Sequence, residues 1–153
     1  MPHWPQAGAR SLGFSAKTTY GLLALMELAD VESSGERLQV GEIAARQAIP
    51  ERYLEQMMTS LRRGGILRSI RGARGGYQLA RPAAQISLSE VIACLEGEPD
   101  QPDPNSGSTE LQVISALADE LRRQRIARLA ATTLADLRQD RDARLQAQAM
   151  YFI

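Results

Sequence analysis

Two short helical patterns that meet at Ile49-Pro50 constrain the fold more than any other feature of the sequence. We predict one helix over residues 41–48 and a second over residues 51–63, because proline suits a helix start and Gly64-Gly65 supplies a left-handed cap. The second pattern carries apolar side chains at helical spacing, at Leu54, Met57, Met58 and Leu61. Two short helices joined by a tight break are typical of a helix-turn-helix, whose second helix enters the DNA major groove.

The face of the second helix that this stripe leaves open is polar and carries residue types that read DNA. Arginine pairs with guanine, glutamine with adenine and glutamate with the amino group of cytosine, while tyrosine and threonine hold phosphates. The candidate DNA-binding residues on this helix are Arg52, Tyr53, Glu55, Gln56, Thr59, Arg62 and Arg63. The solvated face of an ordinary amphipathic helix is the alternative, since any surface helix carries such residues.

A hairpin pattern with an arginine- and glycine-rich loop follows directly. Two β-prone segments, residues 66–70 and 77–79, flank the loop sequence RGARGG. Glycine lets the backbone approach a sugar-phosphate chain closely, and a narrow A·T-rich minor groove attracts a guanidinium group. The candidate DNA-binding residues of this wing are Arg71, Gly72, Arg74, Gly75, Gly76 and Tyr77. The alternative is a glycine-rich turn with incidental charge, and the position directly after the helix pair argues against it.

The rest of the chain predicts helices on both sides of these elements. Ser15 suits the N-cap of a helix to about residue 31, and Ser87 and Glu90 form a capping-box pattern before a helix to about residue 96. A longer helix is expected over residues 109–131, and Thr133 opens a last one to about residue 144. The longer helix carries an apolar stripe that needs a partner, so the predicted dimerisation residues are Leu111, Ile114, Leu117, Ala118 and Leu121.

These elements divide the chain into four predicted regions. Residues 1–13 are expected to be a flexible tail, 14–97 a winged helix-turn-helix DNA-binding domain, 98–108 an acidic linker rich in proline and glycine, and 109–153 a helical dimerisation region. The predicted fold class is mostly α with a small β-hairpin wing and a long C-terminal dimerisation helix. The composition agrees: aromatic residues make up only 5% of the chain, so the core must be built from Leu, Ile, Ala and Met.

The formal charge of the whole chain is zero, yet its two halves differ in sign. Residues 37–81 contain nine arginines and three glutamates, whereas residues 89–142 contain eleven acidic residues and six arginines. This asymmetry indicates a basic binding module joined to an acidic second module. No apolar run reaches membrane-spanning length and the start carries no apolar signal segment, so we expect a cytoplasmic protein without a membrane partner.

Beyond these patterns, residues 15–96 resemble the IscR-like, or Rrf-two type, bacterial winged-helix regulators. The resemblance rests on the segments SAKTTYGLLALMELA, VGEIAARQAIPERYLEQMMTSLRRGGIL, SIRGARGGYQLARP and ISLSEVIACLEG. It implies a homodimer joined largely through the long C-terminal helix, with each protomer reading one half of a palindromic operator. It also implies that Glu55 influences base choice and that Arg71 inserts into the minor groove.

The chain departs from this family at the cofactor site. Many members hold an iron–sulfur cluster on three closely spaced cysteines after the wing-following helix, sometimes with a histidine, whereas this chain has EGEPDQPDPNSGSTE there. Other members use carboxylate or histidine ligands from the first helix, where this chain has no histidine. We therefore predict no cofactor. The only cysteine, Cys94, is interpreted as a small buried residue, with redox sensing or single-thiolate ligation as alternatives.

The acidic residues near the linker are a further candidate. Glu96, Glu98, Asp100 and Asp103 are oxygen ligands within a few residues of one another. Their interleaved prolines favour a solvated tether over a cation, effector or partner site, because hard-cation sites need convergent geometry.

The predicted function is sequence-specific transcription regulation by a homodimer bound to double-stranded DNA. An enzyme is not expected, because the only histidine, His3, lies in the tail and no GxSxG, HExxH, P-loop or dinucleotide motif occurs. A winged-helix adaptor that works through a protein partner, a small-molecule effector or a redox or metal signal keeps the same fold. The excess of arginine on the predicted DNA face argues against the adaptor.

Overall fold

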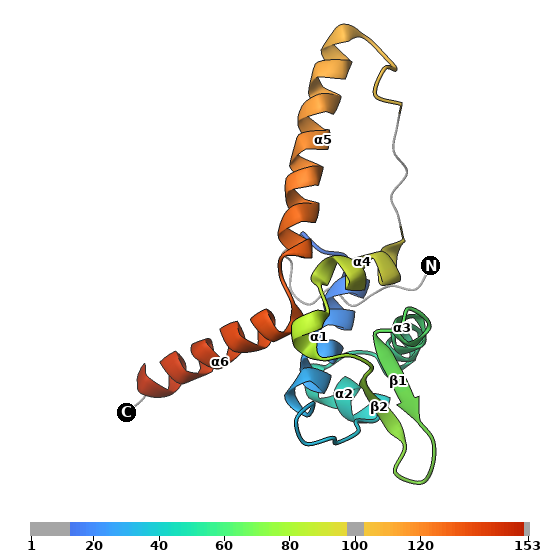
Figure 1. Ribbon diagram of the computed structural model, residues 1–153, viewed down its shortest axis with the longest axis vertical. Helices are drawn as coiled ribbons and strands as arrows, with labels where there is room; N and C mark the ends of the chain where they lie inside the picture. Colours follow the sequence, from blue (N-terminus) through green and yellow to red (C-terminus); the bar gives the residue numbers. More distant parts are fainter. Residues whose placement is uncertain (1–12, 98–102, 152–153) are drawn as a thin grey trace.

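The computed structural model describes residues 13–97 and 103–151. Within these ranges the chain is mostly helical with one two-stranded antiparallel sheet, which confirms the predicted fold class (Figure 1). The elements are α1 (Ala16–Asp30), α2 (Val40–Gln47), α3 (Glu51–Arg63), β1 (Leu67–Ile70), β2 (Gly76–Leu79), the short 3-10 helix η1 (Ala83–Gln85), α4 (Leu88–Glu96), α5 (Thr109–Ala130) and α6 (Leu134–Tyr151). Residues 1–12 of the expected tail and 98–102 of the expected linker lie outside the described residues. No helix in the described ranges combines the length and apolarity that a membrane span requires.

Helix α1 is the centre of the core. It begins at the predicted N-cap, where the Ser15 hydroxyl accepts a hydrogen bond from the backbone N–H of Thr18 at 3.1 Å. Apolar residues are buried around much of its circumference: Tyr20, Leu22, Ala24, Leu25, Leu28 and Ala29. The reason is tertiary, since α1 contacts α2, α3, α4, α6 and β2. A helix enclosed on several sides does not need the single apolar stripe of a surface helix.

Helices α2 and α3 form the predicted helix-turn-helix. All four apolar residues expected to face inward from α3 are buried: Leu54, Met57, Met58 and Leu61. The turn passes through Ala48, whose φ of 54° and ψ of 44° are left-handed. This conformation costs a residue with a Cβ about 1–2 kcal/mol. The buried neighbour Ile49 holds the turn in place by donating its backbone N–H to the Ala44 carbonyl at 3.0 Å. At the far end of α3, Gly65 adopts the predicted left-handed conformation, with a φ of 78°.

The wing is a hairpin that is also fastened to the body. Strands β1 and β2 pair in antiparallel register from Leu67 opposite Leu79 to Ile70 opposite Gly76. Tyr77 exchanges two backbone hydrogen bonds with Leu38, at 2.8 and 3.1 Å, and so joins β2 to the segment before α2. A side chain at Gly76 would place its Cβ 2.7 Å from the Leu38 carbonyl oxygen. Glycine at this position therefore permits the close approach of the two backbones.

The turn between α5 and α6 is bound to the chain around the start of α4. The predicted capping box of Ser87 and Glu90 is present at the start of α4. Leu88 donates its backbone N–H to the Thr132 carbonyl at 2.9 Å, and Leu134 donates to the Ile86 carbonyl at 3.0 Å. The Leu134 side chain is fully buried in the same core as α1. Helix α6 therefore starts inside the core, while α5 projects from it (Figure 1).

The first half of α6 is bound to the end of α1. The Arg138 guanidinium donates to the Ala29 carbonyl at 2.7 Å, and Arg141 Nη1 donates to Asp30 Oδ2 at 2.6 Å. Hydrogen bonds to Asp30 and Asp142 raise the pKa of Arg141. Arg138 thus binds a backbone carbonyl at the C-terminal end of α1, and Arg141 pairs with the carboxylate of the last helix residue, Asp30.

The predicted end of the last helix, near residue 144, is wrong. Helix α6 continues to Tyr151, and every residue from Asp142 onward in the helix is exposed. The sequence after residue 144 contains Leu, Gln, Ala and Met with no glycine or proline. These are good helix formers without a stop signal, so the helix propagates although its side chains are exposed.

Candidate nucleic-acid interface

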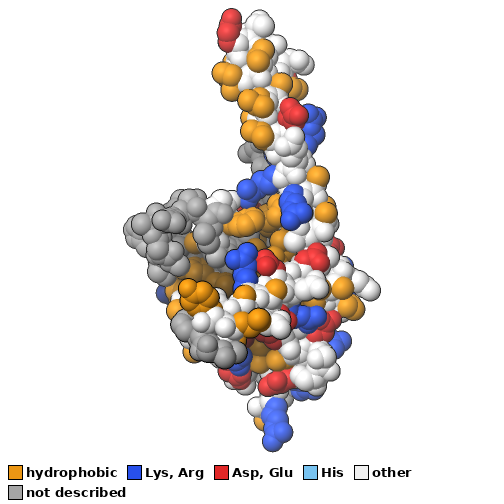
Figure 2. Space-filling view, turned by 90° about the vertical axis from the view of Figure 1, so that its left-hand side faces the viewer, with side chains coloured by type: hydrophobic (Ala, Val, Ile, Leu, Met, Phe, Trp, Pro, Cys, Tyr) orange, Lys and Arg blue, Asp and Glu red, His pale blue; other side chains and the backbone are white. Residues whose placement is uncertain are grey.

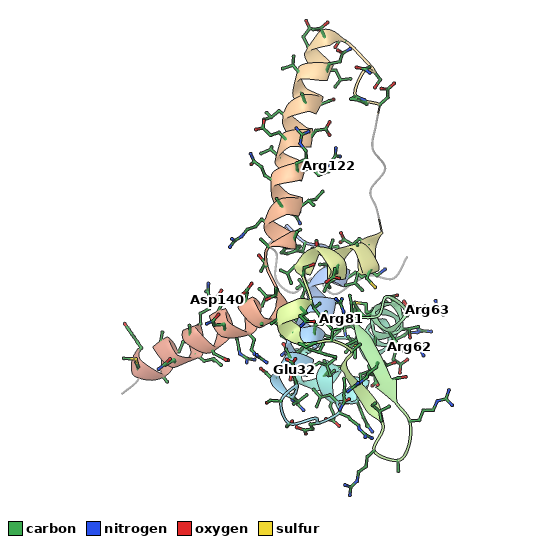
Figure 3. All side chains as sticks on the ribbon, in the orientation of Figure 1. Glu32, Arg62, Arg63, Arg81, Arg122 and Asp140 are labelled. Carbon is green, nitrogen blue, oxygen red and sulfur yellow. The ribbon has the colours of Figure 1, made fainter. Side chains whose placement is uncertain are left out.

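The outward face of α3 presents most of the residues predicted to contact bases. Five of them are exposed: Arg52, Glu55, Gln56, Arg62 and Arg63. Figure 3 labels the last two, which lie at the C-terminal end of the helix. The buried apolar stripe fixes this orientation, because it packs the opposite face of α3 into the core. The polar face is therefore open to a ligand along the length of the helix.

Two of the predicted α3 residues are less available. Tyr53 is partly buried and packs against the core. The Thr59 hydroxyl donates to the Glu55 carbonyl at 2.9 Å, and the neighbouring Ser60 hydroxyl donates to the Gln56 carbonyl at 3.1 Å. Such bonds hold a hydroxyl against its own helix. The arginine, glutamate and glutamine side chains are accordingly the ones best placed to reach a base edge.

The arginines of α3 and of the wing loop form no ion pair with any residue that the structure describes. The arginines that do form ion pairs with described residues lie elsewhere: Arg46, Arg81, Arg122, Arg138, Arg141 and Arg144. A guanidinium without a carboxylate partner keeps its full charge and all five of its N–H donors for an external anion. Seven of the ten described arginines without an ion pair lie on α3, on the wing or on the segment beside it: Arg37, Arg52, Arg62, Arg63, Arg68, Arg71 and Arg74. The other three, Arg123, Arg125 and Arg128, lie on α5.

The wing loop presents Arg71 and Arg74 in exposed positions. The loop closes through a hydrogen bond from the Gly75 N–H to the Gly72 carbonyl at 2.9 Å. Gly72 has a φ of 118°, and a Cβ at Gly75 would lie 2.5 Å from the Ile70 carbonyl oxygen. Both glycines are therefore required by the loop itself. Figure 3 shows long side chains projecting outward from this loop.

Gly76 and Tyr77 lie at the base of the wing and not at its tip. Both belong to β2, and Tyr77 is partly buried against the core beside the bridge to Leu38. The same bridge brings Arg37 and Gln39, which sequence reasoning did not select, next to the wing, and both are exposed. The one sequence feature that could have indicated Arg37 is that it lies in the arginine-rich segment, residues 37–81. The pairing that locates it joins segments far apart in the chain, so sequence reasoning missed it.

Helix α3 and the wing lie on one side of the molecule, at the lower right of Figure 1, while α5 and α6 project away from them. Helix α3 contacts β1 directly. The structure therefore brings the candidate residues of the helix and of the loop to one side.

A second surface without a partner in the described chain runs along α5. Leu111, Ile114, Leu117 and Leu121 are 48%, 64%, 58% and 57% exposed, and Ala118 is exposed as well. Val113, which the sequence stripe did not include, is 66% exposed. No residue of α5 is buried, and Figure 2 shows apolar side chains along this projecting helix. Contiguous exposed apolar surface of this kind is typical of surfaces that bind another protein, a membrane or a ligand.

Cys94 lies on α4 against the C-terminal end of α3. Its thiol donates to the Ser60 carbonyl at 3.0 Å and leaves no room for a Cβ on Gly64. Partial burial raises the pKa of the Cys94 thiol, so the neutral form is favoured. These contacts support the interpretation of Cys94 as a small packing residue between α3 and α4.

Comparisons with known proteins agree with this geometry. The Rrf2 family model, described as "Iron-dependent Transcriptional regulator", matches residues 14–140. A Synechocystis sp. protein named as a candidate HTH-type transcriptional regulator is 40% identical over 130 residues, which are 82% of this chain and 87% of that protein. The HTH-type transcriptional regulator IscR of Cereibacter sphaeroides is 43% identical over 83 residues, 54% of each chain. The chain spans about half the length of this and several other relatives that it matches. Among solved structures, T. potens IscR superposes with a TM-score of 0.71 and 34% identity, covering 87% of this chain and 90% of that one.

The family description names iron, but the residues of this chain do not fit a cluster held by cysteines. The sequence contains one cysteine and one histidine. In the ranges that the structure describes, no three His, Cys, Asp or Glu side chains converge as metal ligands. A ligating cysteine must be a thiolate, whereas the Cys94 thiol donates to Ser60 and has a raised pKa. No step of the proposed function therefore depends on iron.

Proposed function

The chain belongs to the Rrf2 family of transcriptional regulators, and we propose that it binds a palindromic DNA operator as a homodimer. In this proposal α3 enters the major groove and the wing loop enters the adjacent minor groove. Each protomer reads one half-site, so the two-fold symmetry of the protein matches that of the operator.

The concentration of unpaired arginines on one side carries this proposal. Arg52, Arg62 and Arg63 of α3 and Arg71 and Arg74 of the wing loop have no carboxylate partner among the described residues, although the chain as a whole is neutral. Neutralising phosphates and releasing their counterions provides most of the non-specific affinity of a DNA-binding protein.

The proposed roles of the side chains follow from where they lie. Arg52, Glu55 and Gln56 contribute to base readout, with Glu55 accepting from the cytosine amino group. Arg62, Arg63 and Tyr53 hold phosphates, which position the helix. In the wing, Arg71 and Arg74 enter the minor groove, and the glycines permit the approach of the loop backbone.

The dimer is proposed from the exposed stripe of α5. A helix with no buried residue and an apolar stripe of this length requires a partner surface, and a second copy of the same helix supplies a matching one. We further propose that residues 14–97 form the DNA-binding domain, 98–108 the linker and 109–153 the dimerisation region. Because Leu134 is buried in the core around α1, the start of α6 also contributes to the stability of the DNA-binding domain.

Selected-site sequencing with the full-length protein tests the proposal. A palindromic sequence is expected to be enriched at low salt, and its affinity is expected to fall steeply with added salt, by a log–log slope of about −0.9 for each phosphate neutralised. A failure to enrich any sequence at low salt would contradict operator binding and favour the adaptor that acts through a protein partner. Sedimentation at micromolar concentration tests the dimer separately, because a monomer would contradict the role of α5.

A further inference from the structure

A cavity of about 220 Å³ opens at the base of the wing. Leu28 of α1 and Leu79 of β2, both buried, give it an apolar floor, and Val31 and Pro82 add apolar side walls. This volume is smaller than the ~300–1,000 Å³ typical of sites for drug-sized ligands. A ligand of this cavity is therefore a small metabolite with an apolar part.

Two opposite charges line the cavity without an ionic partner in the described chain. Arg68 of β1 donates only to a neutral amide oxygen, with Nε and Nη2 at 3.1 and 2.9 Å from Gln78 Oε1. The Glu36 carboxylate, in the connection between α1 and α2, forms no ion pair or hydrogen bond with a described residue. One cationic and one anionic group are thus open to a bound molecule.

The other two charged residues of the cavity wall, Glu32 and Arg81, are already engaged (Figure 3). Glu32 accepts a hydrogen bond from the Ala83 N–H at 3.0 Å and pairs with Arg138 at 3.6 Å. Arg81 pairs with Glu90 at 3.1 Å. Each of these charges is balanced by its own partner, so neither is free to bind a charged group of a ligand.

We propose that this cavity binds a free α-amino acid with a small apolar side chain, and that its occupancy tightens operator binding. The ligand carboxylate binds the Arg68 guanidinium, its ammonium group binds the Glu36 carboxylate, and its side chain contacts Leu28 and Leu79. A dicarboxylate would meet the repulsion of Glu36, and a polyamine would meet that of Arg68. The link to the operator rests on the proposed function, while the binding site itself does not.

The hydrogen bonds at the cavity explain how a ligand would act on the wing. Gln78 Nε2 donates to the Gly35 carbonyl at 2.6 Å, so the neutral Gln78 amide links Arg68 on the wing to the α1–α2 connection. A carboxylate competes well for Arg68, because charge-assisted hydrogen bonds are about twice as strong as neutral ones. The amino acid then joins β1 to Glu36 through two charge-assisted contacts. A wing fixed to the body in this way loses less conformational freedom when it binds DNA.

Calorimetric titration of the DNA-free, full-length protein tests the site. L-Valine and L-alanine are the probes, and N-acetyl-L-valine and L-valine methyl ester are the matched ligands that each lack one charge. At least one free amino acid is expected to bind, and each blocked derivative of valine is expected to bind about tenfold more weakly or worse than valine. The same loss is expected for Arg68→Gln and Glu36→Gln. The equivalent substitutions on α5, Arg123→Gln and Glu120→Gln, lie far from the cavity lining and are expected to leave binding unchanged.

A second measurement tests the link to DNA. The affinity for the selected operator, measured by fluorescence anisotropy, is expected to rise about fivefold or more at saturating amino acid, and not to change in the Arg68→Gln variant. Thermal unfolding of each variant establishes that it is folded. No heat of binding with either amino acid, or binding that both cavity substitutions leave intact, overturns the site. Amino-acid binding without a change in operator affinity overturns the proposed effect on DNA binding. If the protein binds no DNA at all, the calorimetric titration still tests whether the cavity binds an amino acid.

Discussion

Two regions of the molecule differ in which side chains they bury and which they expose. One is the domain formed by α1 to α4 and the wing; the other is helix α5. The domain buries its apolar residues around α1 and leaves the arginines of α3 and the wing loop without ion pairs among the described residues. Helix α5 also carries arginines without ion pairs among the described residues, Arg123, Arg125 and Arg128, but unlike the domain it leaves leucines such as Leu117 and Leu121 exposed. Free guanidinium groups suit an external polyanion, and exposed leucines suit a second protein surface. The two regions therefore differ in the kind of partner that each one lacks.

The largest expected effect is on the dimer. Leu117→Glu places a charge in the apolar stripe of both copies, and because burial of each leucine contributes about 1.5–3 kcal/mol, the dimer should weaken by about a hundredfold or more. Sedimentation velocity measures the change, and circular dichroism should show the domain still folded. Arg123→Glu, on the opposite face of α5, is the control and should leave the dimer intact. If the Leu117→Glu protein is still dimeric, the apolar stripe of α5 is not the dimer interface.

The next effect is on operator affinity. Arg71→Ala should weaken binding by about 1–3 kcal/mol and lower the salt dependence, because one exposed guanidinium of the wing is lost. Fluorescence anisotropy at several salt concentrations measures both quantities. Arg144→Ala on α6 removes an arginine that pairs with Asp140 and should change little. Equal losses for the two variants would show that unpaired charge does not distinguish the regions.

A change at Glu55 should alter sequence preference more than overall affinity. Glu55→Gln converts a carboxylate acceptor into an amide that suits adenine, so discrimination at one operator position should change by about 1–3 kcal/mol. Selected-site sequencing of the variant shows which base is affected. Glu42→Gln on α2, outside the predicted reading face, serves as the control. An unchanged consensus would assign Glu55 to the solvated face.

The start of α4, to which the turn between α5 and α6 is bound, should lose stability when its helix cap is removed. Ser87→Ala removes the hydroxyl acceptor at the start of α4 and should lower the free energy of unfolding by about 1 kcal/mol in urea denaturation. The hydrogen bond from the Ser87 backbone, followed by the effect of Arg81, lowers the pKa of Glu90. This contribution to stability is present above the ordinary carboxyl pKa and is lost as the pH falls through the lowered value.

Glu90→Gln separates the charge from the cap, because glutamine also completes a capping box. The variant should keep most of the stability at neutral pH. Below about pH 4 its free energy of unfolding should fall less steeply than that of the unsubstituted protein. An unfolding free energy with the same pH dependence in both proteins would show that Glu90 does not contribute to acid sensitivity.

The smallest expected effect lies in the helix-turn-helix. Ala48→Gly should stabilise the domain by up to about 1 kcal/mol, since glycine adopts the left-handed φ of 54° without strain but is more flexible when unfolded. Thermal unfolding measures the gain. Ala45→Gly, at an exposed position inside α2, is the matched control and should destabilise by about 0.5–1 kcal/mol. A loss of stability in both variants would argue against strain at Ala48.

Most of the domain could be predicted because its signals act within one or two turns of chain. Pro50 and the glycine pair predicted the bounds of α3, and Ser15 and Ser87 predicted two caps that the structure confirms. The end of α6 was predicted wrongly because no local signal ends it. The list of DNA contacts is still a prediction, since the position of a base depends on a molecule outside the chain.

The sequence by itself determined the helix-turn-helix, the arginine-glycine wing, the opposite charge of the two halves and the lack of cluster cysteines. Each of these depends on residue type and on spacing along the chain. Only the tertiary structure decided that α1 is enclosed, that Tyr77 pairs with Leu38, that Leu134 joins the core and that Arg68 and Glu36 line one cavity. The physical reason is that these features join segments far apart in the chain, and their positions follow from packing and not from local preference.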